Sequence, residues 1–197
     1  MFALEREAMD RDGLVIDALD RLLPAGRVLD VGAGDGFTAA RLDAARDVVC
    51  LEPDDRMIAR RDELRWVRGD AAHLPFAAAS FSGAYATWAY FFSRGWDPTP
   101  GIVELDRVVA AGGPLAIVDN LGGDAFSALA DDDISADPAF WASQGFGLQP
   151  VDTSFRFDDI DRARRLLGFF FGDRGRQAAT MEVGFRVGIF SRASRGA

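Results

Sequence analysis

The amino-acid sequence predicts an α/β fold, in which a parallel sheet is covered by helices on both faces. Short apolar runs of strand length alternate with stretches whose apolar residues recur at helical spacing, and this alternation is typical of the class. A glycine-rich turn follows the first apolar run, as it does where a parallel strand leads into a helix. The chain has 197 residues, of which 49% are hydrophobic, so we expect one domain with a sizeable core.

The first 120 residues are expected to alternate helices with strands. Apolar residues recur at helical spacing between residues 14 and 23, which predicts an N-terminal helix that ends at Pro24. The predicted strands are residues 27–31, 48–51, 65–68, 81–88 and 115–118. Further helices are predicted at residues 37–45, 54–61 and 98–110.

After residue 120 the pattern changes. Residues 122–150 are acidic and irregular, with helical fragments near 125–130 and 138–144. Beyond them we predict a strand at 153–157, a helix at 158–171, a turn at 172–176 and a strand at 183–191. The last residues, 193–197, are expected to form a frayed tail.

The charge of the chain argues against two classes of partner. It has 22 basic and 31 acidic residues, a net charge of −9, and every basic residue is an arginine. Nucleic acids and anionic membrane surfaces both require a positive surface on the protein. We therefore expect neither a nucleic-acid partner nor a membrane partner. Chemistry that depends on a lysine, such as Schiff-base formation, is also excluded.

The cysteine content and the apolar runs bear on the compartment and on metal binding. Cys50 is the single cysteine, so no internal disulfide and no cysteine-cluster metal site is expected. No apolar run approaches the roughly 20 residues of a membrane helix. No signal-peptide pattern is visible in residues 1–11. These observations predict a cytoplasmic protein without a metal, and the acidic run 131–133 is interpreted as a solvated loop.

The glycine-rich turn at residues 32–36 is expected to bind a nucleoside, because glycines let a ligand approach the backbone closely. A dinucleotide-binding fingerprint would need a third glycine where this chain has Phe37. Asp30 and Asp35 would also crowd a pyrophosphate with like charge, which is unfavourable on the order of several kcal/mol. The turn therefore favours a ligand with positive character, such as a sulfonium beside an ammonium.

Two further acidic residues follow predicted strands. Glu52 closes the second strand, where a carboxylate can accept both hydroxyls of a ribose. Asp70, with Ala71 beside it, closes the third strand, where it could accept from the exocyclic amine of an adenine. Because ligands of parallel sheets bind outside the carboxyl ends of the strands, these residues are expected at one edge.

These segments together resemble the motifs of the class I S-adenosylmethionine-dependent methyltransferases. Residues 28–36 (VLDVGAGDG) resemble the family's first motif, and residues 51–54, 69–76 and 104–113 follow in the family's order. Within the family, the chain is most similar to small-molecule methyltransferases related to enzymes of ubiquinone and menaquinone biosynthesis. The resemblance covers residues 14–120 well, and residues 153–192 only as a pattern of strand, helix and strand.

The resemblance implies a Rossmann-like three-layer sandwich with a seven-stranded, mostly parallel sheet and an antiparallel last strand. It implies S-adenosyl-L-methionine as the cofactor, bound by Asp30, Gly32, Ala33, Gly34, Gly36, Glu52, Pro53, Asp70 and Ala71. The single domain would comprise an N-terminal helix (1–26), a cofactor-binding half (27–120), an acceptor-side insertion (121–152), a strand–helix–strand segment (153–192) and the tail (193–197).

The end of the fourth strand is where an acceptor is expected. It lacks the motif of the enzymes that methylate nucleic-acid bases, which agrees with the acidity of the chain. Its aromatic residues are interpreted either as the lining of an acceptor pocket or as core packing. They are Trp88, Tyr90, Phe91, Phe92 and Trp96.

The sequence yields only weak candidates for a catalytic residue. Asp119 and Asn120 follow the fifth strand on the expected acceptor side, although either could cap the strand. Tyr90 belongs to the aromatic cluster, and His73 is the one histidine of the chain, where a loop residue bonded to backbone is the simpler interpretation.

The predicted function is transfer of the sulfonium methyl group to a small-molecule acceptor by in-line displacement. A strong general base is not required, because most of the rate can come from alignment and desolvation. The alternatives are a non-catalytic protein that binds the cofactor or a partner, an NAD-dependent oxidoreductase, and a transferase similar to spermidine synthase.

Overall fold

The computed structural model describes residues 1–42, 44–58, 63–89 and 96–197. These residues form a seven-stranded sheet with the order β3-β2-β1-β4-β5-β7-β6. Only β7 runs antiparallel to its neighbours, and the other pairings are parallel. The strands are β1 (Gly26–Val31), β2 (Arg46–Glu52), β3 (Arg65–Arg68), β4 (Gly83–Thr87), β5 (Pro114–Asn120), β6 (Gly147–Arg156) and β7 (Glu182–Ala193). The predicted sheet and its antiparallel last strand are confirmed.

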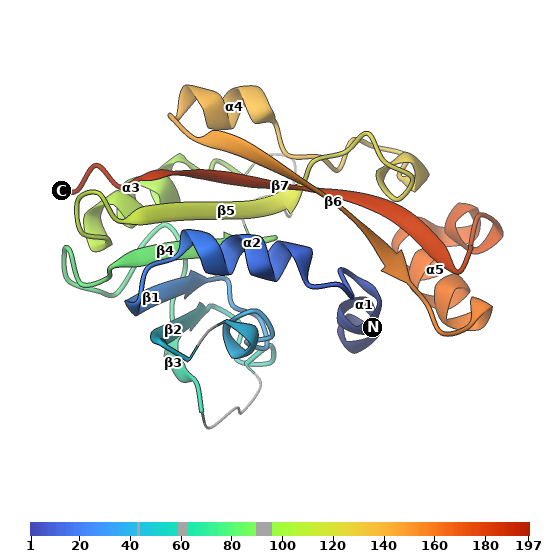
Figure 1. Cartoon of the computed structure of the whole chain (residues 1–197), viewed down its shortest axis with the longest axis horizontal. Helices are drawn as coiled ribbons and strands as arrows, with labels where there is room; N and C mark the ends of the chain where they lie inside the picture. Colours follow the sequence, from blue (N-terminus) through green and yellow to red (C-terminus); the bar gives the residue numbers. More distant parts are fainter. Residues whose placement is uncertain (43, 59–62, 90–95) are drawn as a thin grey trace.

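Helices cover both faces of this sheet, and two apolar clusters fill the layers between them. One cluster joins the sheet to α2 (Leu14–Leu22) and α5 (Ile160–Gln177), and α1 (Phe2–Ala8) packs at its edge. The other joins the sheet to α3 (Thr99–Val108) and α4 (Pro138–Ser143). Figure 1 shows α2 lying along the strands, with α1 and α5 together at one end of the molecule.

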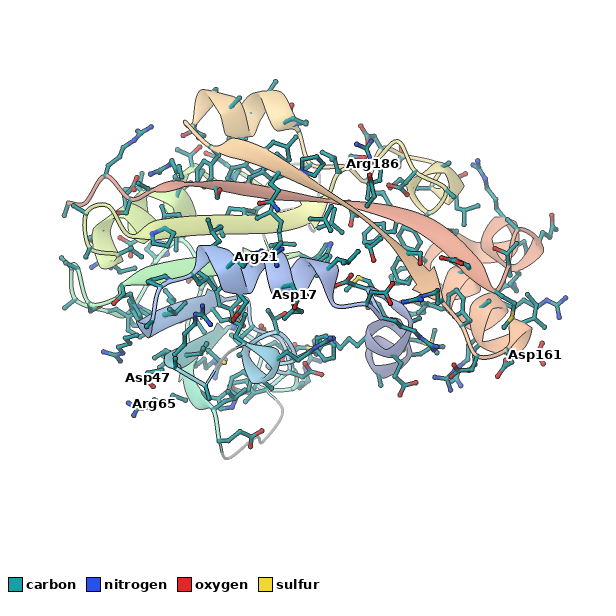
Figure 2. The ribbon with its side chains drawn as sticks, viewed as in Figure 1. Asp17, Arg21, Asp47, Arg65, Asp161 and Arg186 are labelled. Carbon is teal, nitrogen blue, oxygen red and sulfur yellow. The ribbon has the colours of Figure 1, made fainter. Side chains whose placement is uncertain are left out.

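The central strands are apolar because both of their faces are covered. In β5, the residues from Leu115 to Asp119 are all buried, as expected for a parallel strand between two helical layers. Helix α2 is amphipathic instead, with Val15 and Leu19 buried and with Asp17 and Arg21 exposed (Figure 2). The three-layer arrangement thus follows from where each element carries its apolar residues.

The N-terminal segment forms two helices rather than one. The chain turns between α1 and α2, with Asp10 at φ 50° and Gly13 at φ 74°. The carboxylate of Asp10 accepts hydrogen bonds from the N–H groups of Leu14 and Val15 at 3.0 and 2.9 Å, so it caps α2. The apolar periodicity did not reveal this turn, because Asp10 acts through a cap and not through a break in the pattern.

The connection after the glycine turn is also different from the prediction. Instead of a helix at 37–45, the described residues 37–42 and 44–45 form turns and one 3₁₀ segment, Ala39–Arg41. The next predicted helix, 54–61, is a turn at residues 55–57, and residues 59–62 lie outside the described part.

Two C-terminal elements are longer than predicted. Strand β6 begins at Gly147, six residues before the predicted start, because it pairs with β7 along its whole length. It is an edge strand, so Pro150 is tolerated within it. Helix α5 continues to Gln177 past a kink at Phe171 and Gly172, where a turn was predicted.

Candidate functional site

A cavity of about 520 Å³ opens at the carboxyl ends of β1, β2 and β4. From β1 the chain builds the sheet in one direction to β2 and β3, and then crosses to the other side of β1 to form β4 and β5. Ligands of open parallel sheets are expected at this point, where the strand order reverses. Seven of the nine residues predicted to bind a cofactor line this cavity: Gly32, Ala33, Gly34, Glu52, Pro53, Asp70 and Ala71. Asp30 and Gly36 are not among its lining residues.

The glycine turn forms one wall of the cavity and is held against β2. The N–H groups of Gly32 and Ala33 both donate to the carbonyl oxygen of Leu51, at 2.9 and 3.0 Å. A Cβ atom on Gly32 would lie 2.5 Å from that of Ala89, and Gly32 has φ 72°. Only glycine meets both conditions, so the close approach of the turn to the end of β4 depends on it.

Glu52 braces this turn from the end of β2. Its Oε2 accepts from the Gly34 N–H at 2.9 Å, and its Oε1 accepts from the Asp54 N–H at 3.0 Å. The residue is buried and also lines the cavity. Because each carboxylate oxygen can accept more than one hydrogen bond, Glu52 can still accept from hydroxyl groups of a ligand.

Asp30 lies below the cavity rather than in its wall. Its side chain is fully buried, and its Oδ2 accepts from the Tyr85 hydroxyl at 2.9 Å. Its Oδ1 has no hydrogen-bond partner in the part of the chain that the structure describes. Burial and, more weakly, the charge of Glu52 raise the pKa of Asp30 to about 7, while the Tyr85 hydrogen bond acts in the opposite direction.

Gly36 has a packing role in the structure. A Cβ atom there would lie 2.5 Å from Leu64 Cδ1 and 3.0 Å from the ring of Trp66. The glycine therefore lets the turn pack against the residues at the start of β3.

Asp70 follows β3 and lines the cavity together with its neighbour Ala71. Its Oδ1 accepts from the Ala72 N–H at 2.8 Å and lies 3.4 Å from Nδ1 of His73. The side chain of His73 is 86% exposed and does not line the cavity. Its position fits a loop residue.

Of the other two catalytic candidates, the structure describes only Asp119. Asp119 is buried, with Oδ1 accepting from the Asn120 N–H at 2.7 Å and Oδ2 without a hydrogen-bond partner among the described residues. Burial raises its pKa to about 7, but it does not line the cavity. Tyr90 lies outside the described residues, as do Phe91 and Phe92.

Helices α1 and α5 complete the cavity, and the sequence analysis assigned neither of them to the site. Helix α1 contributes Glu5 and Arg6, the turn after it contributes Met9, and α5 contributes Phe170. Arg6 forms an ion pair with Asp35 of the glycine turn, so α1 is tied across the site. No local pattern could reveal these residues, because only the folded chain brings both helices to the sheet edge.

Glu5 is the acidic residue of this added wall. Burial raises its pKa, and the positive charges of Arg6 and of the Met1 amino group oppose the shift. Thr38 and Thr87 add hydroxyl groups to the same cavity, with their Oγ1 atoms 3.4 Å apart. Within the described residues, no group of three or more histidine, cysteine, aspartate or glutamate side chains is placed to hold a metal ion.

The comparisons with known proteins agree with this geometry. Residues 29–117 match a family model described as a methyltransferase domain. The chain is therefore similar to methyltransferases over this segment. It is 35% identical over 111 residues to a demethylmenaquinone methyltransferase of Renibacterium salmoninarum, covering 54% of this chain and 46% of that protein. It is 31% identical over 120 residues to an O-methyltransferase of Pyrenophora dematioidea, covering 54% and 44%.

The aligned part of the chain spans less than half the length of these curated relatives. Solved structures match its fold over more of the chain. The YcgJ protein of Bacillus subtilis has a TM-score of 0.61 at 19% identity, covering 94% of this chain and 98% of that one. The [4+2]-cyclase SpnF has a TM-score of 0.60 at 18% identity, covering 92% and 81%. Among the helices of the described residues, none is long and apolar enough to cross a membrane.

Proposed function

We propose that the chain binds S-adenosyl-L-methionine in this cavity and transfers its methyl group to a small-molecule acceptor. The observation that carries the proposal is the convergence of the glycine turn, Glu52 and Asp70 on one cavity. Its volume of about 520 Å³ lies within the usual range of small-molecule sites.

The charges of the cavity suit a cationic nucleoside. The carboxylates of Glu5, Glu52 and Asp70 line it, whereas the positive charge of Arg6 is paired with Asp35. A sulfonium with an ammonium nearby is therefore favoured over an anionic ligand.

The same site is unsuited to the pyrophosphate of NAD. Dinucleotide-binding folds place the pyrophosphate at the N-terminus of an α-helix that follows the glycine turn. Here the turn leads into a 3₁₀ segment, Ala39–Arg41, in place of that helix. This difference supports the methyltransferase over the oxidoreductase alternative.

Different residues of the cavity are expected to bind different parts of the cofactor. We expect Glu52 to accept the ribose hydroxyls, Asp70 and Ala71 to border the adenine, and Gly32–Gly34 to admit the methionine part. Bound S-adenosylmethionine supplies an activated methyl group. In-line displacement at that carbon needs alignment and exclusion of water, which the apolar wall of Met9, Trp88 and Phe170 supports.

Calorimetric titration with S-adenosylmethionine, S-adenosylhomocysteine and NAD tests the binding half of the proposal. We expect the two adenosyl compounds to bind and NAD to bind weakly or not at all. Methyl transfer from labelled S-adenosylmethionine to a panel of phenols, amines and thiols tests the other half. Binding without transfer would favour the non-catalytic alternative, whereas tight binding of NAD alone would refute the proposal.

The substitution Glu52→Ala tests the ribose assignment. It removes the acceptor of the Gly34 and Asp54 N–H groups and the expected acceptor of two hydroxyls, so S-adenosylhomocysteine should bind about 1–3 kcal/mol more weakly. Glu63→Ala, at an exposed position outside the cavity, is the matched control. Unchanged affinity in a folded Glu52→Ala protein would exclude the assignment.

A further inference from the structure

Trp88 occupies an unusual backbone conformation at the edge of the cavity. It follows β4 directly and has φ 52°, in the left-handed region that a bulky residue rarely adopts. Such a conformation costs free energy and persists only where the surrounding structure imposes it.

Two hydrogen bonds from the neighbouring strand hold this residue. The Trp88 N–H donates to the carbonyl oxygen of Val118 at 2.8 Å, and its indole Nε1–H donates to Oδ1 of Asn120 at 3.0 Å. Asn120 is itself fixed, because its Nδ2 donates to the carbonyl oxygen of Ile134 at 3.2 Å and its own carbonyl accepts from the Ala136 N–H at 2.8 Å. The indole ring is thus positioned from the end of β5 and from the segment that follows it.

This arrangement decides what the ring offers to the cavity. The indole has a single polar group, the Nε1–H, and Asn120 already accepts from it. What Trp88 presents to the cavity is therefore hydrocarbon and the face or edge of an aromatic ring. Trp96 and Phe170 line the same cavity, and Met9 adds a flexible apolar side chain.

The charged groups of the cavity restrict the ligand further. Among its described lining residues, Arg6 is the one basic side chain, and its charge is paired with Asp35. Glu5 stands on the same helix as Arg6, and its carboxylate would repel an anion. An apolar ligand without negative charge fits these walls best.

We propose that Trp88, positioned by Asn120, is the surface on which the acceptor lies, and that the acceptor is an uncharged molecule with a planar aromatic ring. This inference rests on the proposed function, because it assigns the part of the cavity left for an acceptor. Aromatic rings gain from offset or edge-to-face contact beyond the area that they bury, and this separates a planar ring from a saturated one of the same size. Trp88 is then a residue that determines specificity, and Asn120 is a positioning residue that acts through it.

The experiment uses three probes of one size, titrated into the protein with and without saturating S-adenosylhomocysteine. They are 1-naphthol, its saturated analogue decahydro-1-naphthol, and 1-naphthoate. We expect 1-naphthol to bind at least about tenfold more tightly than either of the other two. Equal binding of the saturated analogue, or no binding of 1-naphthol, would overturn the proposal.

Substitutions then locate the contact. Trp88→Leu should weaken 1-naphthol binding about tenfold or more and leave S-adenosylhomocysteine affinity and decahydro-1-naphthol affinity nearly unchanged. Phe169→Leu is the matched control, because Phe169 is a 59% exposed aromatic residue that does not line the cavity. Unchanged 1-naphthol affinity in Trp88→Leu would also overturn the proposal.

The positioning role of Asn120 has its own readout. Asn120→Leu removes the acceptor for the indole N–H, so it should weaken 1-naphthol binding and change the near-ultraviolet circular dichroism of Trp88. Asn120→Asp keeps that acceptor and should largely restore both. Equal behaviour of the two variants would refute the positioning role. Because S-adenosylhomocysteine binding is measured in the same samples, failure of the cofactor proposal is distinguishable from failure of this one.

Discussion

The carboxyl groups of Asp30 and Asp119 are both buried near the ends of their strands, and both are incompletely hydrogen-bonded. Among the described residues, each has one oxygen with a hydrogen-bond partner and one without. Burial raises the pKa of both to about 7. Since the folded protein favours the protonated form of each group, their ionisation works against folding.

The pH dependence of stability should show this effect for Asp119. An aspartate that is raised from its ordinary pKa of 3.8 to about 7 on folding lowers the unfolding free energy as the pH rises between those values, and the loss is complete above about pH 8. Asp119→Asn keeps an acceptor oxygen for the Asn120 N–H and cannot ionise. Its unfolding free energy should therefore fall less between about pH 4 and pH 8, by on the order of a few kcal/mol.

Urea denaturation at the two pH values provides the measurement. Asp161→Asn is the control, because the Asp161 side chain is 87% exposed and its removal should leave the pH dependence unchanged. If the unfolding free energy fell equally with pH in the wild type and in Asp119→Asn, the buried carboxyl group would not titrate as described.

Gly34 and Gly112 allow a matched test of the glycine turn. Both have positive φ, 57° and 83°, but a Cβ atom on Gly34 would lie 3.4 Å from Nη2 of Arg6, whereas one on Gly112 would meet nothing within 4 Å. Alanine at either position should cost about 1 kcal/mol of stability from backbone strain. Only Gly34→Ala should weaken S-adenosylhomocysteine binding, by about tenfold, or about 1.4 kcal/mol. Equal affinities of the two variants in calorimetry would mean that the turn does not face the ligand.

At the scale of elements, the strands were easier to predict than their connections. The predicted strand 115–118 lies within β5, where an apolar run bounded by turn residues identifies it locally, and the predicted strand 65–68 coincides with β3, where Trp66 and Val67 are followed by Gly69. The helix predicted at 37–45 was wrong, because the described residues of this segment form turns and the 3₁₀ segment Ala39–Arg41.

The turn between α1 and α2 is an element that depends on one side chain. Asp10 is buried, and its two carboxylate oxygens accept from Leu14, Val15 and the hydroxyl of Thr153, which lies on β6. Asp10→Ala should lower the unfolding free energy by about 1–3 kcal/mol, because it leaves these donors without an acceptor. Asp10→Asn, which keeps one oxygen, should lose less. A loss below about 0.5 kcal/mol in urea denaturation of Asp10→Ala would contradict the capping role.

At the scale of the whole molecule, the structure changes how the acidity of the chain is interpreted. Of the four acids predicted at the sheet edge, only Glu52 and Asp70 line the cavity. Asp30 is buried beneath it, and Asp35 is paired with Arg6. The net charge of −9 therefore acts on a ligand mainly through a few carboxylates, and one of these, Glu5, was not predicted at all.

Helix α1 links parts of the molecule that are far apart in the sequence. Arg6 pairs with Asp35 on the glycine turn, and Glu7 pairs with Arg162 on α5. Met9, directly after the helix, forms an isolated antiparallel β-bridge through its backbone with Phe155 of β6. This short helix contributes Glu5 and Arg6 to the cavity wall, although the apolar pattern predicted only one N-terminal helix and no contact with the site.

The sequence by itself determined the class of the fold, the glycine turn and the acids that follow the strands. These features depend on residues that are close together in the chain, such as Gly32, Gly34 and Asp30, so local patterns carry them. The tertiary structure alone decided which of the acids line the cavity, and it brought α1, α5 and the pair of Trp88 and Asn120 to this edge of the sheet. Those contacts join residues that are far apart in the sequence. They form because the strands pair side by side in the order β3-β2-β1-β4-β5-β7-β6.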